Sequence, residues 1–216
     1  MTQDTPFDQA KYWIERHKRL EGDPRSVGNI GKPLEENRRG EEAFKAQVSL
    51  LAKLLRPSFR TVLDLGCGYG RIAHEFLSQG YQYNGIDVSP DAVKQARQNN
   101  PTGTFQVMDL NAWQPDGQFD LVCTFYVLVH FVDDAKWSKF LERALSSVGP
   151  KGYFIFADEF PSERSAAGSH VVARPLSDYT APLAQHGFEY DVTLKTAFVT
   201  ESQSRGSERF YFARRT

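Results

Sequence analysis

The spacing of apolar and polar residues changes near residue 60, and this change divides the chain into two parts. Before it, apolar residues recur at helical spacing over 41–55, which predicts an amphipathic helix. The apolar stripe of this helix consists of Phe44, Val48, Leu51 and Leu55. Another helix is expected over 8–20, with a loop over 22–33 between the two. We therefore predict an N-terminal helical segment over residues 1–58.

After residue 60, short apolar runs alternate with amphipathic segments. The run Phe119–Phe125 is almost continuously apolar, as expected of a strand covered on both faces. Ser89 followed by Pro90 is a typical helix start. The expected strands are 61–65, 81–87, 104–108, 119–125, 153–157, 188–194 and 209–213, and the expected helices are 71–79, 89–99, 133–147 and 176–186. This alternation predicts an α/β fold whose mostly parallel sheet carries helices on both faces.

Composition narrows the class of protein. With 216 residues, the chain has room for one α/β domain and a short additional segment. A formal net charge of -1 gives no electrostatic reason to bind nucleic acid, and no apolar run is long enough to cross a bilayer. Residues 1–6 lack a signal-peptide pattern, and the two cysteines favour neither a disulfide framework nor a zinc site. We expect a cytoplasmic protein with no metal ion and no membrane or nucleic-acid partner.

The strongest chemical signal is the glycine-rich stretch after the first predicted strand. Residues 62–70 read Val-Leu-Asp-Leu-Gly-Cys-Gly-Tyr-Gly, and a helix start follows. Glycine lets a backbone approach a ligand closely, and a helix start offers unpaired N–H groups. A dinucleotide-binding loop reads Gly-x-Gly-x-x-Gly, whereas Arg71 stands here in the position of its last glycine. Asp64 would repel a pyrophosphate but suits a cationic ligand, which disfavours a dinucleotide.

Acidic residues also end the next two predicted strands. Asp87 lies where an acid can accept hydrogen bonds from both ribose hydroxyls of a nucleoside. Val88 is placed to lie against an adenine face, Asp109 to accept from the adenine amino group, and Leu110 to offer its backbone N–H to a ring nitrogen. A single aspartate after a strand is also a common turn former. Acids at three successive strand ends nevertheless favour a ligand site.

Four segments together resemble motifs I to IV of the class I S-adenosylmethionine-dependent methyltransferases. They are Asp64–Gly70, Gly85–Val88, Met108–Leu110 and Phe119–Val122. The resemblance implies a Rossmann-like core over 59–216, with a seven-stranded, mostly parallel sheet whose last strand is antiparallel. It also implies S-adenosylmethionine as methyl donor and S-adenosylhomocysteine as product. The cofactor-binding residues expected from it and from the strand ends are Trp13, Asp64, Gly66, Cys67, Gly68, Gly70, Asp87, Val88, Asp109, Leu110 and Thr124.

Residues after the fourth strand are expected to face the methyl acceptor. His130 has the chemistry of a general base, and Tyr126 is placed to line the pocket or orient the acceptor. The alternative for His130 is a structural role, in which it hydrogen-bonds the backbone and supports its loop. Further candidates are Asp158 and Glu159 for a cationic amine, and Arg174, in a segment with His170, for an anionic acceptor.

The N-terminal segment is expected to act as a lid, because a minimal methyltransferase sheet leaves its cofactor pocket open. Tyr12, Trp13, Arg16 and His17 offer aromatic and cationic contacts within one helix. The alternative is an amphipathic helix that packs on the sheet for stability. Histidines in helical contexts, His17 included, are expected to be surface or packing residues.

Together, these features predict a methyltransferase that acts on oxygen, or on nitrogen, of a small-molecule acceptor. Three alternatives stay open: a protein or RNA methyltransferase, an NAD-dependent oxidoreductase, and a non-catalytic methyltransferase-like binding protein. An oxidoreductase would have a glycine at position 71 and no acid at position 64. The sequence does not indicate the acceptor or the oligomeric state.

Overall fold

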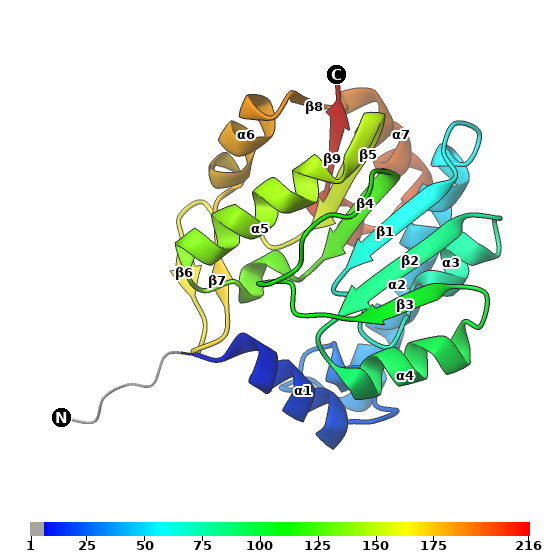
Figure 1. The fold of residues 1–216 in the computed structure, drawn as a ribbon. Coiled ribbons are helices and arrows are strands. Elements are labelled where there is room, and N and C mark those ends of the chain that lie inside the picture. Colours follow the sequence, from blue (N-terminus) through cyan, green and yellow to red (C-terminus); the bar gives the residue numbers. More distant parts are fainter. Residues whose placement is uncertain (1–6) are drawn as a thin grey trace.

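The computed structural model describes residues 7–216, which form a seven-stranded sheet with helices on both sides (Figure 1). The strands of this sheet are β1 (Thr61–Leu65), β2 (Gln82–Asp87), β3 (Thr104–Val107), β4 (Phe119–Phe125), β5 (Val148–Ala157), β8 (Phe188–Tyr190) and β9 (Phe210–Arg215). The helices are α1 (Gln9–Arg19), α2 (Leu34–Leu55), α3 (Ala73–Leu77), α4 (Pro90–Asn99), α5 (Asp134–Ser146), α6 (Leu176–Gln185) and α7 (Val192–Ser202). The smaller elements are a ribbon of β6 (Ser165–Ala166) and β7 (Val172–Ala173), and the 3-10 turns η1 (Pro24–Ser26), η2 (Leu128–His130) and η3 (Arg205–Arg209). Residues 1–6, in which we expected no signal peptide, lie outside the described part.

The strand order of the sheet is β3-β2-β1-β4-β5-β9-β8. The neighbouring strands from β3 through β2, β1 and β4 to β5 all pair in parallel. Strand β9 runs antiparallel to both of its neighbours, β5 and β8. The predicted α/β sheet with an antiparallel last strand is therefore confirmed. Because the strand order reverses between β1 and β4, the chain leaves these two strands in opposite directions and opens a crevice at their carboxyl ends.

Two apolar clusters hold helices against the two faces of the sheet. One contains side chains of α2, α3, α4 and α7, including Val48 and Leu51 of α2, which are fully buried. The other contains side chains of α5 and α6, including Phe140 and Tyr179. Figure 1 shows α5 in front of the sheet and α2 behind it. Within the N-terminal segment, α2 is thus a layer of the core, while α1 lies beyond the carboxyl ends of the strands and contacts α4 (Figure 1).

The sequence prediction was wrong for part of the C-terminal region. The strand expected over 188–194 ends at Tyr190, and α7 begins two residues later. The side chain of Asp191 accepts a hydrogen bond from the backbone N–H of Leu194 (2.8 Å) and caps the new helix. An N-cap of this kind satisfies a helix start and here outweighs the strand-like run of Val192–Leu194. The helix expected over 41–55 also begins earlier, at Leu34.

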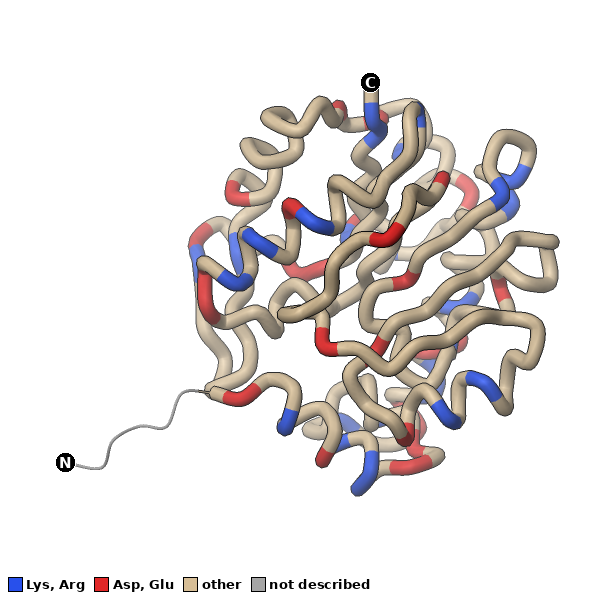
Figure 2. The backbone as a smooth tube through the Cα atoms, viewed as in Figure 1, with Lys and Arg blue, Asp and Glu red and all other residues tan. Residues whose placement is uncertain are grey.

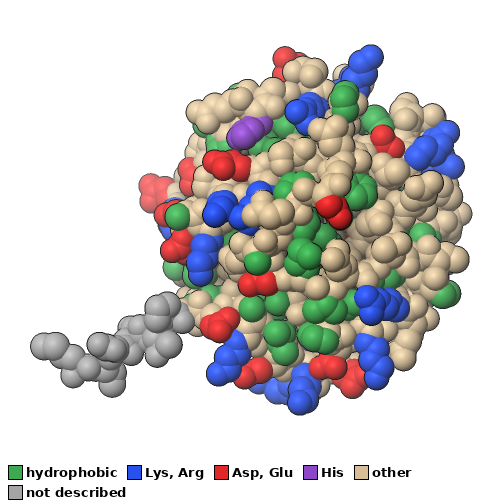
Figure 3. Space-filling model, viewed as in Figure 1, with side chains coloured by type: hydrophobic (Ala, Val, Ile, Leu, Met, Phe, Trp, Pro, Cys, Tyr) green, Lys and Arg blue, Asp and Glu red, His purple; other side chains and the backbone are tan. Residues whose placement is uncertain are grey.

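Charged residues of both signs are spread along the chain (Figure 2), and they are interspersed on the face shown in Figure 3. This distribution gives that face no strongly basic patch. None of the helices within residues 7–216 combines the length and the apolar character that crossing a lipid bilayer requires. The same residues contain no cluster of three His, Cys, Asp or Glu side chains that is able to hold a metal ion.

Candidate functional site

A cavity lies beyond the carboxyl ends of β1, β2 and β4, where the strand order reverses. It encloses about 680 Å³ of space, its open mouth included. Predicted cofactor and catalytic residues on its wall are Trp13, Gly66, Cys67, Gly68, Asp87, Val88, Asp109, Leu110, Tyr126 and His130. We refer to it as the first cavity. The structure therefore brings most of the predicted site residues together in one place.

The glycine loop after β1 forms the floor of the first cavity. Gly66 and Gly68 adopt positive φ angles of 89° and 55°, which L side chains rarely adopt. A Cβ atom on Gly66 would lie 2.5 Å from a Val127 methyl carbon, and one on Gly68 would lie 2.9 Å from a Val27 methyl carbon. Both positions therefore require glycine, and they leave the backbone bare where a ligand would approach it. Gly70 does not line the cavity, and its carbonyl instead accepts from the Asn100 side chain (3.1 Å).

Asp87 at the end of β2 links the glycine loop to the start of α4. Its Oδ2 accepts from the Gly68 N–H and its Oδ1 from the Ser89 N–H, both at 2.9 Å. An ionised carboxylate has about four acceptor sites, so these two bonds leave capacity for a ligand. His17 Nδ1 lies 3.9 Å from Asp87 Oδ1. Burial lowers the pKa of His17, against the opposing effect of Asp87, and favours its neutral form.

Asp64 lies beneath the glycine loop and does not line the cavity. Its carboxylate accepts a hydrogen bond from the Tyr83 hydroxyl, and only 3% of the residue is exposed. Burial raises the pKa of Asp64 to about 7, although the Tyr83 hydrogen bond opposes the shift. A cation bound above the loop would favour the ionised form. Thr124 is likewise buried outside the cavity wall, and no group in residues 7–216 bonds its Oγ1.

The loop after β3 closes the far side of the first cavity with Asp109 and Leu110. Asp109 Oδ1 accepts from the backbone N–H (2.8 Å) and the side-chain amide (2.9 Å) of Asn111. Asp109 is thus a turn former, as the alternative interpretation of the sequence proposed. Asp109 also borders the cavity. It can therefore form the turn and face a ligand at the same time, and the two interpretations are compatible.

His130 lies in η2 and forms part of the wall of the first cavity. Its Nδ1 is 2.8 Å from the His170 carbonyl oxygen. A carbonyl only accepts hydrogen bonds, so Nδ1 carries the proton and Nε2 keeps a free lone pair. Trp13 packs edge-on against the His130 ring, at 4.7 Å between ring centres. Burial lowers the pKa of His130 to about 4, although the bond to His170 opposes the shift, so the ring is neutral at pH 7.

A second, more open cavity adjoins the first and encloses about 1850 Å³, open solvent included. Five residues border both cavities: Trp13, Val27, Arg71, Tyr126 and His130. Tyr126 has a φ of 59°, a conformation that a non-glycine residue rarely adopts and that is typical of functional sites. The two predicted catalytic residues, Tyr126 and His130, thus stand at the boundary between the cavities.

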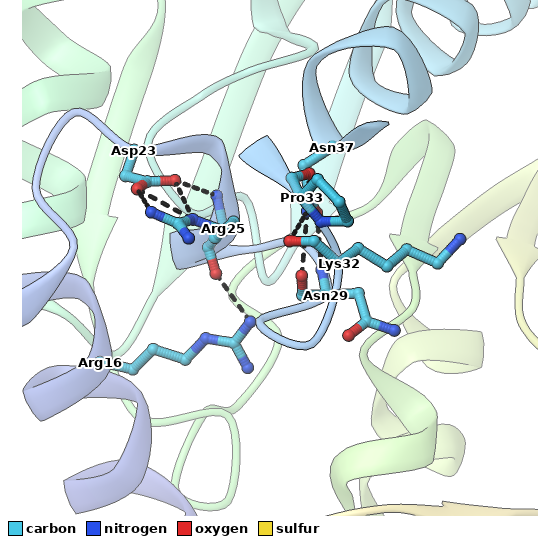
Figure 4. Close-up of polar contacts among 7 residues, drawn as sticks. All are labelled: Arg16, Asp23, Arg25, Asn29, Lys32, Pro33 and Asn37. Atoms are coloured by element: carbon cyan, nitrogen blue, oxygen red, sulfur yellow. Dashed lines mark hydrogen bonds and ion pairs between the residues drawn. The ribbon is translucent and has the colours of Figure 1, made fainter. Parts of the chain in front are cut away.

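The walls of the second cavity come largely from α1, from the loop between η1 and α2, and from α2 itself. Hydrogen bonds hold this loop in place (Figure 4). Arg16 donates to the carbonyls of Arg25 (2.8 Å) and Gly28, and the Asn37 amide donates to Asn29 O (2.9 Å). Asp23 and Arg25 form an ion pair at 2.6 Å within the loop. The loop predicted from the sequence over 22–33 therefore has a defined conformation beside the site.

Two candidates for acceptor binding have structural roles instead. Arg174 is almost fully buried, donates to Phe131 O (2.9 Å) and Asp134 Oδ1 (2.7 Å), and lies outside both cavities. Asp158 is 1% exposed, and burial raises its pKa to about 8, against a hydrogen bond from the Tyr179 hydroxyl (3.4 Å). Its neighbour Glu159 does border the second cavity.

Two charged or titratable residues of the first cavity, His17 and Arg71, were not predicted as binding residues, although His17 was named among the expected lid contacts. His17 was expected as a lid contact and otherwise as a surface or packing residue, and it borders the cavity with 5% of the residue exposed. Its position four residues after Trp13 places both side chains on one helix face, and that spacing was the available signal. Arg71 was considered only as a departure from the dinucleotide pattern. Its guanidinium lies 4.7 Å from the centre of the Phe44 ring and borders both cavities.

Comparison with known proteins agrees with this geometry. Residues 62–152 match a family model described as a methyltransferase domain. Residues 62–152 carry a methyltransferase domain of this family. The predicted family is thereby confirmed, and the match covers β1 to the first part of β5, which includes the glycine loop.

Relatives of the methyltransferase domain act on several substrates. The chain is 39% identical over 108 residues to 2-methyl-6-phytyl-1,4-hydroquinone methyltransferase from Synechocystis sp., covering 47% of this chain and 33% of that protein. It is 32% identical over 143 residues to ubiquinone biosynthesis O-methyltransferase from Xanthomonas campestris, covering 63% and 56%. The chain therefore spans about a third to just over half of the length of these relatives.

The same fold occurs in magnesium protoporphyrin IX methyltransferase from Synechocystis PCC 6803, solved with bound S-adenosylmethionine. The two structures superpose with a TM-score of 0.71 at 18% identity, over 99% of this chain and all of that one. At this identity the likeness establishes the fold. The α1 and α2 region lies within the superposed length, so the N-terminal segment is covered by the likeness as well.

Proposed function

We propose that this chain is an S-adenosylmethionine-dependent methyltransferase that methylates an oxygen, or a nitrogen, of a small-molecule acceptor. The observation that supports this most strongly is the first cavity. It joins the glycine loop to Asp87 and to Asp109–Leu110, at the ends of three successive strands. The relatives, which include a 2-methyl-6-phytyl-1,4-hydroquinone methyltransferase and a ubiquinone biosynthesis O-methyltransferase, agree with it.

The residues present fit the methyl donor. Bare backbone at Gly66 and Gly68 admits its methionine part, and the spare acceptor sites of Asp87 suit the two ribose hydroxyls. Val88 and Leu110 border space that suits an adenine ring, and Asp109 on the same wall would accept from its amino group. Asp64 favours a cationic amine above the loop through its charge rather than by direct contact.

When bound, the donor supplies a methyl group that its positive sulfur has already activated. The protein then has to position the acceptor in line with that methyl group and to exclude water. Trp13 and Val27 border both cavities and are placed to close the passage between them. We propose on this ground that residues 1–58 include the lid of the site, formed by α1 and the loop before α2.

His130 is the proposed proton acceptor for an acceptor hydroxyl. Its Nε2 keeps a lone pair because Nδ1 donates to His170, and the ring borders both cavities. Tyr126 beside it is proposed to orient the acceptor. A nucleophile that carries no proton would need neither a base nor this lone pair, so the role of His130 depends on the acceptor.

The remaining parts of the proposal concern location and partners. Cys67 and Cys123 are free and buried, as suits a protein in a reducing compartment, and we propose a cytoplasmic location. The net charge of -1 and the mixed charges of Figure 2 favour a small acceptor over nucleic acid. Fractionation of the cells that express the chain tests the location.

Calorimetric titration with S-adenosylhomocysteine tests the proposed function. We expect binding to the wild type and about 10- to 100-fold weaker binding to Asp87→Ala, because hydrogen bonds to a charged group contribute about 1.5–3 kcal/mol. The exposed Asp116→Ala is the matched control and should bind like the wild type. A wild type that binds NAD but not S-adenosylhomocysteine would overturn the proposal.

A further inference from the structure

Arg71 has no ion-pair partner in the described part of the chain, although Asp64 and Glu41 lie near enough for its charge to act on them. No acidic group in residues 7–216 lies within ion-pair distance of its guanidinium, which stacks on the Phe44 ring. Arg71 follows the glycine loop and borders both cavities. The geometry thus leaves its hydrogen-bond donors available at the place where donor and acceptor would meet.

Arg16 provides a second positive charge on the wall of the second cavity, and it is buried. Only 5% of the residue is exposed, and its guanidinium donates to three neutral oxygens: Tyr12 Oη (3.1 Å), Arg25 O (2.8 Å) and Gly28 O. Its Nε has no hydrogen-bond partner within residues 7–216. A buried cation without a counter-ion is costly and is usually matched by an anion. The neutral oxygens hold Arg16 in place but do not neutralise it.

The acidic groups around the second cavity already have cationic partners. They pair as Glu36 with Lys32, Glu41 with Lys45 (2.6 Å), and Glu159 with Arg209 (3.2 Å). Among the cations that border this cavity, Arg16 and Arg71 are therefore the two without an ion-pair partner in residues 7–216. Burial is the main cause that lowers the pKa of His170, and the charge of Arg16 lowers it further, which agrees with a positive potential in this space.

We propose that the second cavity binds a methyl acceptor that carries a carboxylate or another anionic group, with Arg71 as its direct partner. Arg16 adds to the field that attracts the anion. Phe44, Trp13 and Tyr126 provide aromatic surface for the body of the acceptor, and Tyr126 and His130 border its reacting end. This inference rests on the proposed function and adds the chemical class of the acceptor.

A panel of matched small carboxylic acids and their carboxamides tests the inference. The set pairs benzoate with benzamide, 4-hydroxybenzoate with its amide, and ten aliphatic and aromatic pairs of similar size. Binding is measured by calorimetry and thermal shift on protein saturated with S-adenosylhomocysteine. We expect at least one acid to bind about tenfold or more tightly than its amide, and this preference to weaken at high salt. If no acid is preferred, the inference is wrong.

Variants then assign the preference to Arg71. Arg71→Met should remove it and Arg71→Lys should restore part of it, while the exposed Lys139→Met on α5 should leave it intact. If Arg71→Met instead weakens S-adenosylhomocysteine binding tenfold and keeps the acid preference, Arg71 serves the carboxylate of the donor, and the inference is overturned.

The two proposals fail in different ways. If the wild type does not bind S-adenosylhomocysteine, the proposed function fails, and the panel is then run on the free protein. If the free protein prefers acids and this preference depends on Arg71, the result still supports an anion site. If it shows no such preference, the anion site is ruled out as well. Arg16→Lys, which keeps the charge while its fold is checked by circular dichroism, should retain the preference.

Discussion

The two cavities that meet at Tyr126 and His130 are built in different ways. The first is bounded mainly by the ends of neighbouring strands, so the regular geometry of the sheet places its residues. The second is bounded by α1, the loop before α2, α2 itself and parts of the chain beyond residue 158. Its shape depends on how segments far apart in sequence pack together. The fold therefore determines the first cavity, whereas packing between distant segments determines the second, which we propose sets the specificity for the acceptor.

The largest loss of donor binding is expected from a substitution in the glycine loop, where the backbone itself forms the wall of the first cavity. Gly68→Val places a branched side chain at a φ of 55°, with its Cβ 2.9 Å from a Val27 methyl carbon. We expect S-adenosylhomocysteine binding to weaken by about 100-fold or more, about 3 kcal/mol, as measured by calorimetry. Gly117→Ala, where the added Cβ meets nothing within 4 Å, is the control. Donor binding that survives in Gly68→Val would contradict the proposed floor of the cavity.

Asp64→Asn should separate stability from donor binding. Burial raises the pKa of Asp64 to about 7, well above its ordinary value of 3.8. The folded state therefore binds the proton more tightly, and stability is lost as the pH rises from about 4 to about 7. The neutral variant should be about 4 kcal/mol more stable than the wild type at pH 8 and similar at pH 4.

The same variant should bind S-adenosylhomocysteine about tenfold more weakly at pH 8, because the charge beneath the loop is gone. Urea unfolding at both pH values and calorimetry at pH 8 measure the two effects. A variant that is destabilised at pH 8 and binds the ligand normally would show that Asp64 has only a structural role.

The contrast between the cavities also explains what the sequence predicted. Strand ends are visible in sequence as apolar runs followed by Gly or Asp, so Gly66, Asp87 and Asp109 were identified before their positions were known. Arg71 was not identified as a site residue because its role depends on its distance from Phe44, which lies in α2, far from the glycine loop in sequence. Spacing indicates a shared helix face but carries no information about contacts between separate elements.

Local chemistry accounts for the error in the fold. The run Val192–Leu194 has the composition of a strand, but Asp191 caps a helix at that point. Arg174 was assigned to the acceptor from its charge alone, whereas Asp134 and a backbone carbonyl hold it in the interior. The Asp191 cap is local and could have been recognised in the sequence, whereas the Asp134 partner of Arg174 lies 40 residues away and emerges only from the three-dimensional structure.

A smaller effect, on the pH dependence of stability, is expected from His130 at the boundary between the cavities. Burial lowers the pKa of His130 to about 4, below its ordinary value of 6.5. The folded state then binds this proton less tightly than the unfolded state, so stability is present above pH 6.5 and is lost as the pH falls toward 4. Between pH 7 and pH 5 the loss should be about 1–2 kcal/mol, and His130→Gln should reduce it. Urea unfolding measures this, with the exposed His186→Gln as control. An unchanged pH dependence in His130→Gln would contradict the burial of a neutral ring at this position.

A crystal structure of the chain with S-adenosylhomocysteine tests the central claim, that the first cavity holds the methyl donor and the second the acceptor. We expect the ribose hydroxyls on the Asp87 carboxylate, the adenine between Val88 and Leu110, and the sulfur directed toward Tyr126 and His130. The second cavity should remain accessible beside that sulfur. A ligand that occupies the second cavity, or one whose ribose makes no contact with Asp87, would contradict the account.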